Sequence, residues 1–579
     1  MLARRPRPTF LIAGLLLLVF AGLPSGCSDD SSAEDDECTA DEQCADDETC
    51  SGGECVATDR SFCATDQDCP SGPYQCVENL CQRQSADAGD AGDDIGEPDD
   101  DTPDADDTGG DDIFDDPSDD EEPPQVESIE PAAGTTGVGV DSAVEITFNE
   151  EMDPVSINFF SIQLRDSDNR KVDTLIDYDE ASRTATVTPE QPLYAATGYR
   201  IKVEAYARDL AGNGLAPEFE ATFYTADDAP QALVDLAEHF APVIYQGIAD
   251  TEGSGPNADL PTRIDFDQNL TATDNAASAQ SGQTPAHVYY HVSESSQYYF
   301  LHYLLYYPTR IASAGDTPAE HDFAGAIFVV DKATDDLLLV EGVRVGSSGE
   351  VTVGYKPEGS PISLSGGGAS GMSLDSFDPA TLESGDDGGT HYPMYVPAGD
   401  HETCHWHESG SNGRCLHSPG EFRGDADKGV VLRAGDSAQR FDDATLDEDS
   451  GLNEMSYELI PFSEEFWAFR GSYAQDGLFE VPFVYDPIGD DRPIGFDGEN
   501  AHVLPRRLQS DATASYGYPP FSWLPSTGAD NDGQWLLDPV YVLPNRYNFG
   551  QTVSTDYCYN SFFDIDHRGD ASVEGCEDN

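Results

Sequence analysis

The densest group of side chains that could bind a metal lies in a short histidine-rich stretch of the chain. Imidazole and carboxylate groups are ligands for zinc and similar ions. The stretch supplies His401, Glu402, His405, His407 and His417. Cys404 and Cys415 also lie in it, and because they are close in sequence we expect them to pair as a disulfide. This composition suits either a metal site or a surface loop that is pinned by its disulfide.

His401, Glu402 and His405 also form the string H-E-x-x-H. In zinc peptidases this string lies on a helix, which sets the two histidines on one face beside a glutamate base. The neighbouring residues predict no long helix here, because prolines and glycines stand on both sides. They are Pro393, Pro397, Gly399, Gly410 and Gly413. We therefore favour the pinned surface loop and keep the zinc peptidase site as the alternative.

Other catalytic patterns give no stronger signal. A serine nucleophile elbow, a phosphate-binding loop or a dinucleotide fingerprint would each need a strand–turn–helix context, and none occurs in one. The glycine-rich run 366–371 lies between β-like segments and indicates a flexible loop. The sequence thus names no catalytic residue, which favours a non-enzymatic protein.

The cysteines indicate an oxidising compartment. The chain has thirteen cysteines, and twelve remain when Cys27, which follows the export signal, is left out. Eight of these form two copies of a four-cysteine unit within residues 27–81: Cys38, Cys44, Cys50 and Cys55, then Cys63, Cys69, Cys76 and Cys81. Each copy has too few apolar side chains for a core, and its spacing is not the C-x2-C of zinc sites, so disulfides are expected to hold it. The other four cysteines are Cys404 with Cys415, named above, and Cys558 with Cys576, which we also expect to form a local disulfide.

Residues 1–26 have the order of an export signal. Three arginines precede an apolar run from Phe10 to Leu23, and Pro24-Ser25-Gly26 leads to Cys27. The ending resembles a bacterial lipobox, although Pro24 stands where an aliphatic residue is preferred. The resemblance implies lipidation of Cys27, and Ser28 in place of an aspartate favours the outer membrane. We expect a lipid-anchored protein on the cell surface.

The chain is strongly acidic, with 28 basic and 112 acidic residues and a net charge of −84. Such a charge excludes a nucleic-acid partner, whose phosphates need basic side chains. Residues 82–125 hold 19 of the acidic residues, one basic residue and almost nothing to bury. This composition predicts a disordered, extended linker that holds the following domains clear of the membrane.

Residues 126–226 predict a small β-sandwich. Val144, Ile146 and Phe148 alternate with polar residues, and turn residues recur at short intervals. The segments Ile146–Asp153 and Asp209–Asn213 resemble the bacterial Ig-like domain first described in surface-layer proteins. The resemblance implies a spacer or adhesion module.

Residues 227–579 form the largest predicted unit. A short helical pattern at Leu233–Phe240 precedes strands expected at His287–Val292, Gln297–Tyr307, Ala324–Asp331 and Leu337–Val345. The second of these is apolar almost throughout, which predicts burial on both faces. The chain is therefore expected to be mainly β, ending in a large antiparallel β-sandwich with few short helices.

This unit resembles Vps62-like domains, relatives of the necrosis-inducing NPP1-like proteins. The resemblance follows the order of several segments, among them Leu236–Tyr245, Glu320–Phe323, His391–Val396 and Phe466–Gly471. In the necrosis-inducing relatives an H-x-x-D-x-E pattern holds a divalent cation. Here only Asp322 matches, because alanines stand at the histidine and glutamate positions.

The expected metal ligands are therefore Asp322 with its neighbours His321 and Glu320, together with His401 and His405. Adjacent strand residues point to opposite faces, so the first three cannot converge from one straight strand. We interpret the chain as a surface-displayed, non-enzymatic lipoprotein that binds an extracellular ligand or cell surface. The alternative is a divalent-cation-dependent membrane-active effector or metallohydrolase.

Overall fold

The computed structural model divides the chain into two compact units, Met1–Thr108 and Gly109–Asn579. In the first unit it describes the backbone of four short strands. In the second it describes residues 122–248 and 256–576, with gaps at 271, 282–283, 311–318, 347–348, 366–371, 386–387, 400, 407–428, 448–451, 473–477, 486–501, 511–516, 524–532 and 571. Residues 1–47, including Cys27, Cys38 and Cys44, lie outside the described part, as do Cys63 and Cys69 and most of the acidic linker.

The first unit contains two hairpins of the same design. The strands are β1 (Glu48–Ser51), β2 (Glu54–Ala57), β3 (Tyr74–Val77) and β4 (Leu80–Arg83). Cys50 lies opposite Cys55 in the first hairpin, and Cys76 lies opposite Cys81 in the second. The two four-cysteine copies therefore place their last two cysteines at equivalent positions of equivalent hairpins.

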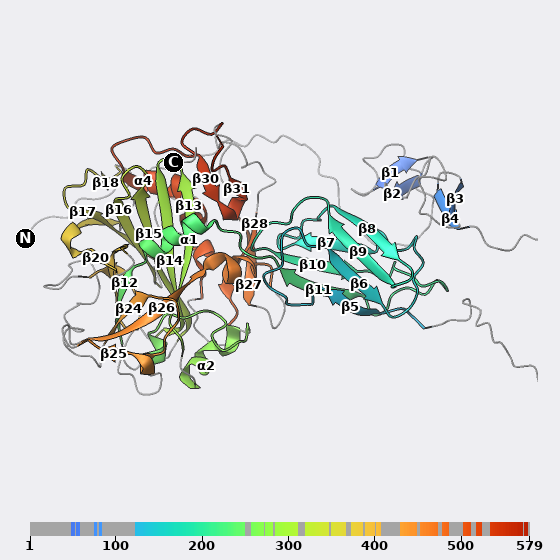
Figure 1. Cartoon of the computed structure of the whole chain (residues 1–579), viewed down its shortest axis with the longest axis horizontal. Helices are drawn as coiled ribbons and strands as arrows, with labels where there is room; N and C mark the ends of the chain where they lie inside the picture. The colour runs from blue at the N-terminus through green and yellow to red at the C-terminus, as the bar shows by residue number, and fades with distance from the viewer. Residues whose placement is uncertain are drawn as a thin grey trace, which may run out of the picture. The chain divides into compact units, whose positions relative to one another are not determined.

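The Ig-like domain is a sandwich of two antiparallel sheets (Figure 1). One sheet has the order β5-β6-β9-β8 and the other β11-β10-β7. The bounds are Val126–Glu130 (β5), Val144–Phe148 (β6), Ile162–Asp166 (β7), Thr174–Asp179 (β8), Thr184–Pro189 (β9), Gly198–Val203 (β10) and Phe219–Tyr224 (β11). The alternation expected at Val144, Ile146 and Phe148 is confirmed, since all three side chains are fully buried in one core.

The C-terminal domain is built on one large sheet of the order β19-β17-β16-β15-β14-β13-β26-β24-β12-β22-β23. Along the chain these strands are β12 (Val243–Gly247), β13 (His287–Ser295), β14 (Tyr298–Arg310), β15 (Ala319–Asp331), β16 (Leu337–Gly346), β17 (Gly349–Pro357), β19 (Ser373–Phe377), β22 (Pro393–Val396), β23 (Cys404–His405), β24 (Gly429–Ala434) and β26 (Asn453–Pro461). Three short strands pair outside this order: β25 (Thr445–Leu446) with β26, β30 (Tyr557–Asn560) with β13, and β31 (Ile565–Asp566) with β30.

The expectation of a purely antiparallel sheet is wrong. The strand pairs β13–β26, β24–β26, β12–β22 and β17–β19 are parallel, so the sheet is mixed. Parallel neighbours need long connections, and here β26 inserts between strands that are distant in the chain. The alternation of side chains along a strand does not reveal such an insertion, because it is the same for both pairings.

The sheet is buried on both faces, as the apolar run of β14 predicted. Along β14, Phe300, Leu304 and Tyr306 belong to one core, whereas Leu301, Tyr303 and Tyr307 belong to the other. Helix α1 (Gln231–His239) and strands β12, β22 and β24 contribute to the second core. The first core contains residues of the ribbon β27 (Phe479–Tyr485) and β28 (His502–Leu508) and of the segment that follows.

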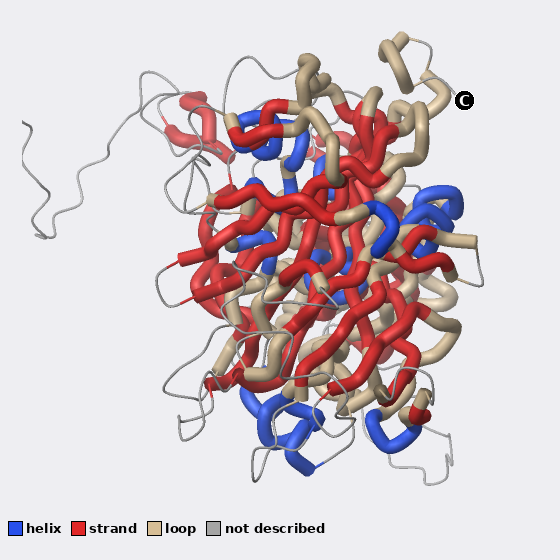
Figure 2. The backbone as a smooth tube through the Cα atoms, turned by 90° about the vertical axis from the view of Figure 1, so that its left-hand side faces the viewer, coloured by secondary structure: helices blue, strands red, loops and turns tan. Residues whose placement is uncertain are grey.

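The helices are short and lie around the strands (Figure 2). Besides α1 they are α2 (Asn275–Ser281), α3 (Gln534–Leu537), α4 (Pro539–Arg546) and a π-helix, η9 (Ser463–Trp467). Single 3-10 turns occupy Pro256–Ala258, Ala272–Asp274, Pro379–Thr381, Phe441–Asp443, Pro520–Ser522 and Ser561–Phe563. Short pairs join β18 (Ser363–Leu364) to β29 (Tyr547–Asn548) and β20 (Glu383–Ser384) to β21 (Thr390–His391).

Two of the predicted disulfide partners can be followed in the C-terminal domain. Cys558 and Cys576 are bonded to each other, which confirms that pair. Cys404 is disulfide-bonded, and Cys415, its expected partner, lies outside the described residues. Within the described part, no helix has the length and apolar character that crossing a bilayer requires.

Candidate functional site

The sequence-predicted residues Asp322 and His401 meet inside the C-terminal domain. His401 Nδ1 lies 2.9 Å from Asp322 Oδ2, and its Nε2 lies 3.2 Å from Asp259 Oδ1. The imidazole stacks on the Tyr307 ring, with the centroids 3.6 Å apart and the planes 4° from parallel. All of these side chains are buried. Strand β15 supplies Asp322, and the turn after β22 supplies His401, which has a φ of 50°.

Charge is balanced within this group, which we call the buried histidine cluster: Asp259, Arg310, Asp322 and His401. Burial alone would lower the pKa of His401, but its hydrogen bonds to Asp259 and Asp322 outweigh burial and raise the pKa to about 9. Arg310 Nη1 lies 3.4 Å from Asp322 Oδ1. Burial raises the pKa of Asp322, and the contacts with His401 and Arg310 oppose that rise.

The cluster as arranged does not suit a divalent cation. The imidazolium of His401 and the guanidinium of Arg310 already neutralise the two carboxylates, and a metal ligand has to present a neutral imidazole. Among the described residues, no group of three or more His, Cys, Asp or Glu side chains has the arrangement of a metal site. We therefore derive no chemistry through a metal here.

The other two ligands expected on β15 lie apart from Asp322. His321 Nδ1 lies 2.9 Å from the Tyr306 hydroxyl, and its Nε2 lies 3.0 Å from the carbonyl oxygen of Gln509. Glu320 accepts a hydrogen bond of 2.5 Å from the Ser510 hydroxyl. Asp322 reaches His401, whereas Glu320 and His321 both contact the segment after β28. The three side chains do not converge on one point, but simple alternation does not describe them, because His321 has a φ of 58°.

The expectation of a surface loop at His401–His405 is wrong for its first half. His401, Glu402 and His405 are each less than 5% exposed. Strand β23 pairs with β22, and the His405 ring lies 5.0 Å from the Tyr392 ring and 5.6 Å from the Phe377 ring. Pairing with the sheet draws this stretch inside, an effect that its prolines and glycines could not indicate.

This stretch has no helix to set His401 beside His405. His401 contacts Asp259 and Asp322, whereas His405 lies among aromatic rings. The helical geometry that a zinc peptidase needs is therefore missing from residues 401–406. His407 and His417 lie outside the described residues.

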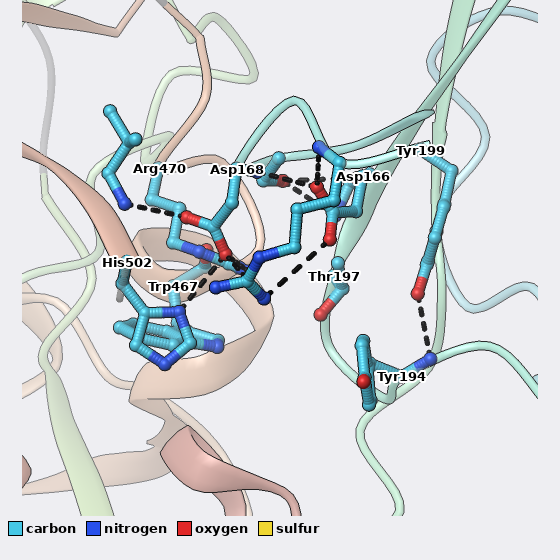
Figure 3. Close-up of polar contacts among 12 residues, drawn as sticks. Asp166, Asp168, Tyr194, Thr197, Tyr199, Trp467, Arg470 and His502 are labelled. Atoms are coloured by element: carbon cyan, nitrogen blue, oxygen red, sulfur yellow. Dashed lines mark hydrogen bonds and ion pairs between the residues drawn. The ribbon is translucent and has the colours of Figure 1, made fainter. Parts of the chain in front are cut away.

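A second polar cluster joins the Ig-like domain to the C-terminal domain (Figure 3). Asp168 lies in the turn after β7, where Asp166 Oδ1 accepts hydrogen bonds from the backbone N–H groups of Asp168 and Arg170. This local turn holds Asp168 toward the other domain. There it accepts hydrogen bonds from Arg470 Nη2 (3.4 Å), His502 Nδ1 (3.0 Å) and the backbone N–H of Val503 (2.7 Å).

Asp168 is ionised and buried, with its side chain 2% exposed. Burial alone would raise its pKa, but the Arg470 charge and the bonds from His502 and Val503 together hold the pKa of Asp168 well below its ordinary value. Burial lowers the pKa of His502 although Asp168 opposes this, so the imidazole is neutral and its Nδ1 carries the donated proton. A buried carboxylate that accepts three hydrogen bonds would be strongly destabilised by the loss of these donors.

Apolar contacts tighten the same junction. The Tyr224 ring lies 4.0 Å from the Phe469 ring. A Cβ on Gly198 would meet the Ala468 carbonyl oxygen at 3.0 Å, and one on Gly471 would meet the Ser167 backbone at 3.1 Å. Glycine thus permits the two backbones to approach closely at both points.

A cavity of about 100 Å³ opens beside Asp168. Both domains line it: Asp168, Tyr194 and Thr197 come from the Ig-like domain, and Trp467, Arg470 and His502 come from the C-terminal domain. Arg470 lies over the Trp467 ring, 4.3 Å from its centroid, and Trp467 ends the π-helix η9. Concave sites between domains with aromatic walls and a few polar groups are the usual places for small ligands.

Sequence reasoning missed this junction because it treated residues 126–226 as a spacer. One signal was present. Phe466–Gly471, quoted above only for its family resemblance, contains Trp467, Phe469, Arg470 and Gly471, all of which lie at the junction. Asp168 itself is one of many aspartates in an acidic chain and could not have been chosen from the sequence.

Comparison with known proteins identifies one part of the chain. Residues 120–225 match the family model described as bacterial Ig-like domain, so this segment is a bacterial Ig-like domain, as its strands predicted. No curated protein sequence matches the chain. The resemblance of residues 227–579 to Vps62-like and NPP1-like proteins stays a prediction.

Several solved structures have weak similarity to the chain. The copper resistance protein PcoC from Escherichia coli is 16% identical over 18% of this chain and 99% of its own, with a TM-score of 0.16. The N-terminal part of the bacterial S-layer protein SbsC is 11% identical over 40% of this chain and 43% of its own, with a TM-score of 0.15. A structure titled as a toxin fold for microbial attack and plant defense is 17% identical over 32% of this chain and 72% of its own, with a TM-score of 0.19. TM-scores this low support no argument about this chain.

Proposed function

We propose that this protein is a surface-displayed, non-enzymatic lipoprotein whose Ig-like and C-terminal domains act together as one binding unit. Lipid on Cys27 would anchor it in the outer membrane. The cysteine repeats and the acidic linker would carry the binding unit away from that membrane, toward an extracellular ligand or another cell.

The observation that carries this proposal is the burial of Asp168 against Arg470 and His502. A simple spacer needs no buried ion pair with the domain that it carries, and burying an anion is expensive unless the contact is kept. The cavity lined by both domains lies at the same place. An Ig-like domain that completes a cavity is more than a spacer, and this supports a two-domain binding unit.

The display part of the proposal is tested on intact cells. An epitope tag after Asn579 should be labelled by antibody on cells that produce the natural sequence, and the protein should sediment with the outer membrane. Cys27→Ser should release the protein into the soluble or secreted fraction, with Ser28→Ala as the matched control. Membrane retention of the Cys27→Ser protein without detergent would contradict the lipid anchor.

A divalent-cation-dependent effector or metallohydrolase is the second candidate. It rests on the convergence of Asp259, Asp322 and His401 on one point. We rank it second because Arg310 and His401 already balance the carboxylates. Metal analysis of purified protein before and after chelator tests it, since about one bound metal ion per chain, lost in the Asp322→Asn variant, would favour it over the binding protein.

A further inference from the structure

Two buried polar atoms at the junction cavity lack a hydrogen-bond partner among the described residues: His502 Nε2 and Arg470 Nε. Both side chains are more than nine-tenths buried, and both residues line the cavity. His502 Nδ1 is held by Asp168, so Nε2 lies on the side of the ring turned away from that carboxylate (Figure 3). A buried polar atom without a hydrogen bond is destabilising, and a suitable ligand would remove that cost.

The two atoms have opposite hydrogen-bonding character. Since Nδ1 of the neutral His502 ring carries the proton, Nε2 is an acceptor. Arg470 Nε carries a hydrogen and is always a donor. A hydroxyl group can donate to the first and accept from the second. A primary ammonium group offers only donors and sulfate only acceptors, so each would leave one of the two atoms unsatisfied.

The walls add an apolar surface and more acceptors. Trp467 and Phe562 are buried in the lining, and Tyr194, whose side chain is 46% exposed, stands at the rim. The carboxylates of Asp228 and Asp564 lie in the lining as well. Aromatic faces pack against apolar C–H groups, while carboxylates accept hydrogen bonds from hydroxyl groups.

From these features we propose that the junction cavity binds one pyranose unit of an extracellular saccharide. A sugar ring has hydroxyl groups that donate and accept on its edge and C–H groups on its faces, which matches both the unpartnered atoms and the aromatic walls. By the same measure one water needs about 10–15 Å³, so 100 Å³ holds several waters or one sugar ring. This proposal rests on the proposed binding function and names its ligand class.

Saturation-transfer NMR on the full chain tests the proposal, in a detergent without a sugar head group. The probes are glucose, galactose, mannose and N-acetylglucosamine, with propylammonium and methyl sulfate as a cation that only donates and an anion that only accepts. We expect at least one sugar to bind with a millimolar or lower Kd. Binding of propylammonium or methyl sulfate without any sugar, or of none of the six probes, would overturn the saccharide proposal.

Variants locate the site. Tyr194→Ala removes an exposed rim aromatic and should weaken sugar binding at least fivefold, whereas Tyr206→Ala, at a tyrosine 67% exposed in the same domain, should not change it. His502→Phe should abolish binding by removing the acceptor. If that variant loses its cooperative melting, Asp564→Asn is compared instead with the exposed Asp570→Asn. Sugar binding that survives both Tyr194→Ala and Asp564→Asn would place the site elsewhere and refute the proposal.

The sugar-binding measurement does not depend on whether the protein is displayed on the cell surface. Failure of sugar binding leaves the membrane fractionation of Cys27→Ser untouched, and release without a lipid anchor leaves the sugar measurement untouched. The two proposals therefore fail separately.

Discussion

Two histidines of the C-terminal domain share a setting of aspartate and arginine but differ in what surrounds them. His401 is bonded through both ring nitrogens and stacked on Tyr307. Among the described residues, His502 has a hydrogen-bond partner at one nitrogen only, and its side chain belongs to the lining of a cavity. All members of the first group belong to the C-terminal domain, whereas the second group takes Asp168 from the Ig-like domain and still leaves His502 Nε2 without a partner among the described residues.

The difference shows that residue type alone does not make a site. His401 drew attention in the sequence because it stands among other histidines and a glutamate, yet its position is sealed and charge-balanced. His502 stands alone in the sequence, but its setting leaves one acceptor for a partner. The sealed cluster is suited to hold the fold, and the incomplete one is suited to bind.

A substitution in the buried histidine cluster should cause the largest loss of stability. Asp322→Ala leaves Arg310 and the imidazolium of His401 buried with one carboxylate between them, which should lower the free energy of unfolding by about 3–5 kcal/mol. Denaturant unfolding followed by tryptophan fluorescence measures it. The control is Asp375→Ala, on the edge strand β19. A loss below about 1 kcal/mol would show that the cluster does not stabilise the domain.

Breaking the junction should cost less, because the two domains can separate and expose Arg470 to water. For Asp168→Ala we expect a loss of about 2–4 kcal/mol and faster proteolysis between residues 226 and 230. Asp173→Ala, at an exposed position before β8, is the matched control. Equal proteolysis rates for Asp168→Ala and the natural sequence would mean that Asp168 does not hold the domains together.

The disulfide beside the cavity offers a narrower test. The chain between Cys558 and Cys576 contains Phe562 and Asp564, two residues of the cavity wall. Cys576→Ser should lower stability by about 2–3 kcal/mol and weaken sugar binding, while the His401 cluster stays intact. Calorimetry together with the NMR titration measures both effects. If the Cys576→Ser protein is fully folded and binds sugar with unchanged affinity, the disulfide does not shape the cavity.

The two histidines should respond to pH in opposite directions. The raised pKa of His401 makes its stabilising contribution complete below about pH 6.5, and this contribution is lost as the pH rises through about 9. The lowered pKa of His502 makes its contribution complete above about pH 6.5, and that contribution fades as the pH falls. Unfolding curves should therefore show a lower free energy of unfolding at pH 5 and at pH 9.5 than at pH 7.

Substitutions of the two histidines test which of them causes the loss of stability at low pH and at high pH. His401→Gln should reduce the alkaline loss, and His502→Gln should reduce the acid loss. Burial also lowers the pKa of His302 to about 3 and that of His321 to about 4, so these histidines contribute to the acid loss as well. An acid loss that persists in His502→Gln would come from these other buried histidines, because a pKa that is lowered in the folded state makes protonation favour unfolding.

The sequence predicted the elements better than their assembly. Alternation located β6, and the apolar run of β14 correctly indicated burial on both faces, because both signals are local. The parallel neighbours of β26 and the burial of His405 depend on pairing between distant segments, which leaves no local mark. The cavity depends on two domains at once, so neither half of its lining, Tyr194 or Trp467, indicated it alone.

The position of β26 also bears on how the domain forms. This strand lies between β13 and β24, so among the described strands it joins the two halves of the large sheet. Its partner β13 is synthesised long before it, so a contact of large sequence separation must form late, and such contacts slow folding. Until β26 arrives, β13 has an open edge rich in tyrosine and valine, which is prone to pair with other chains. The export that we propose for this chain would make both strands available together, if the whole chain crosses the membrane unfolded before it folds.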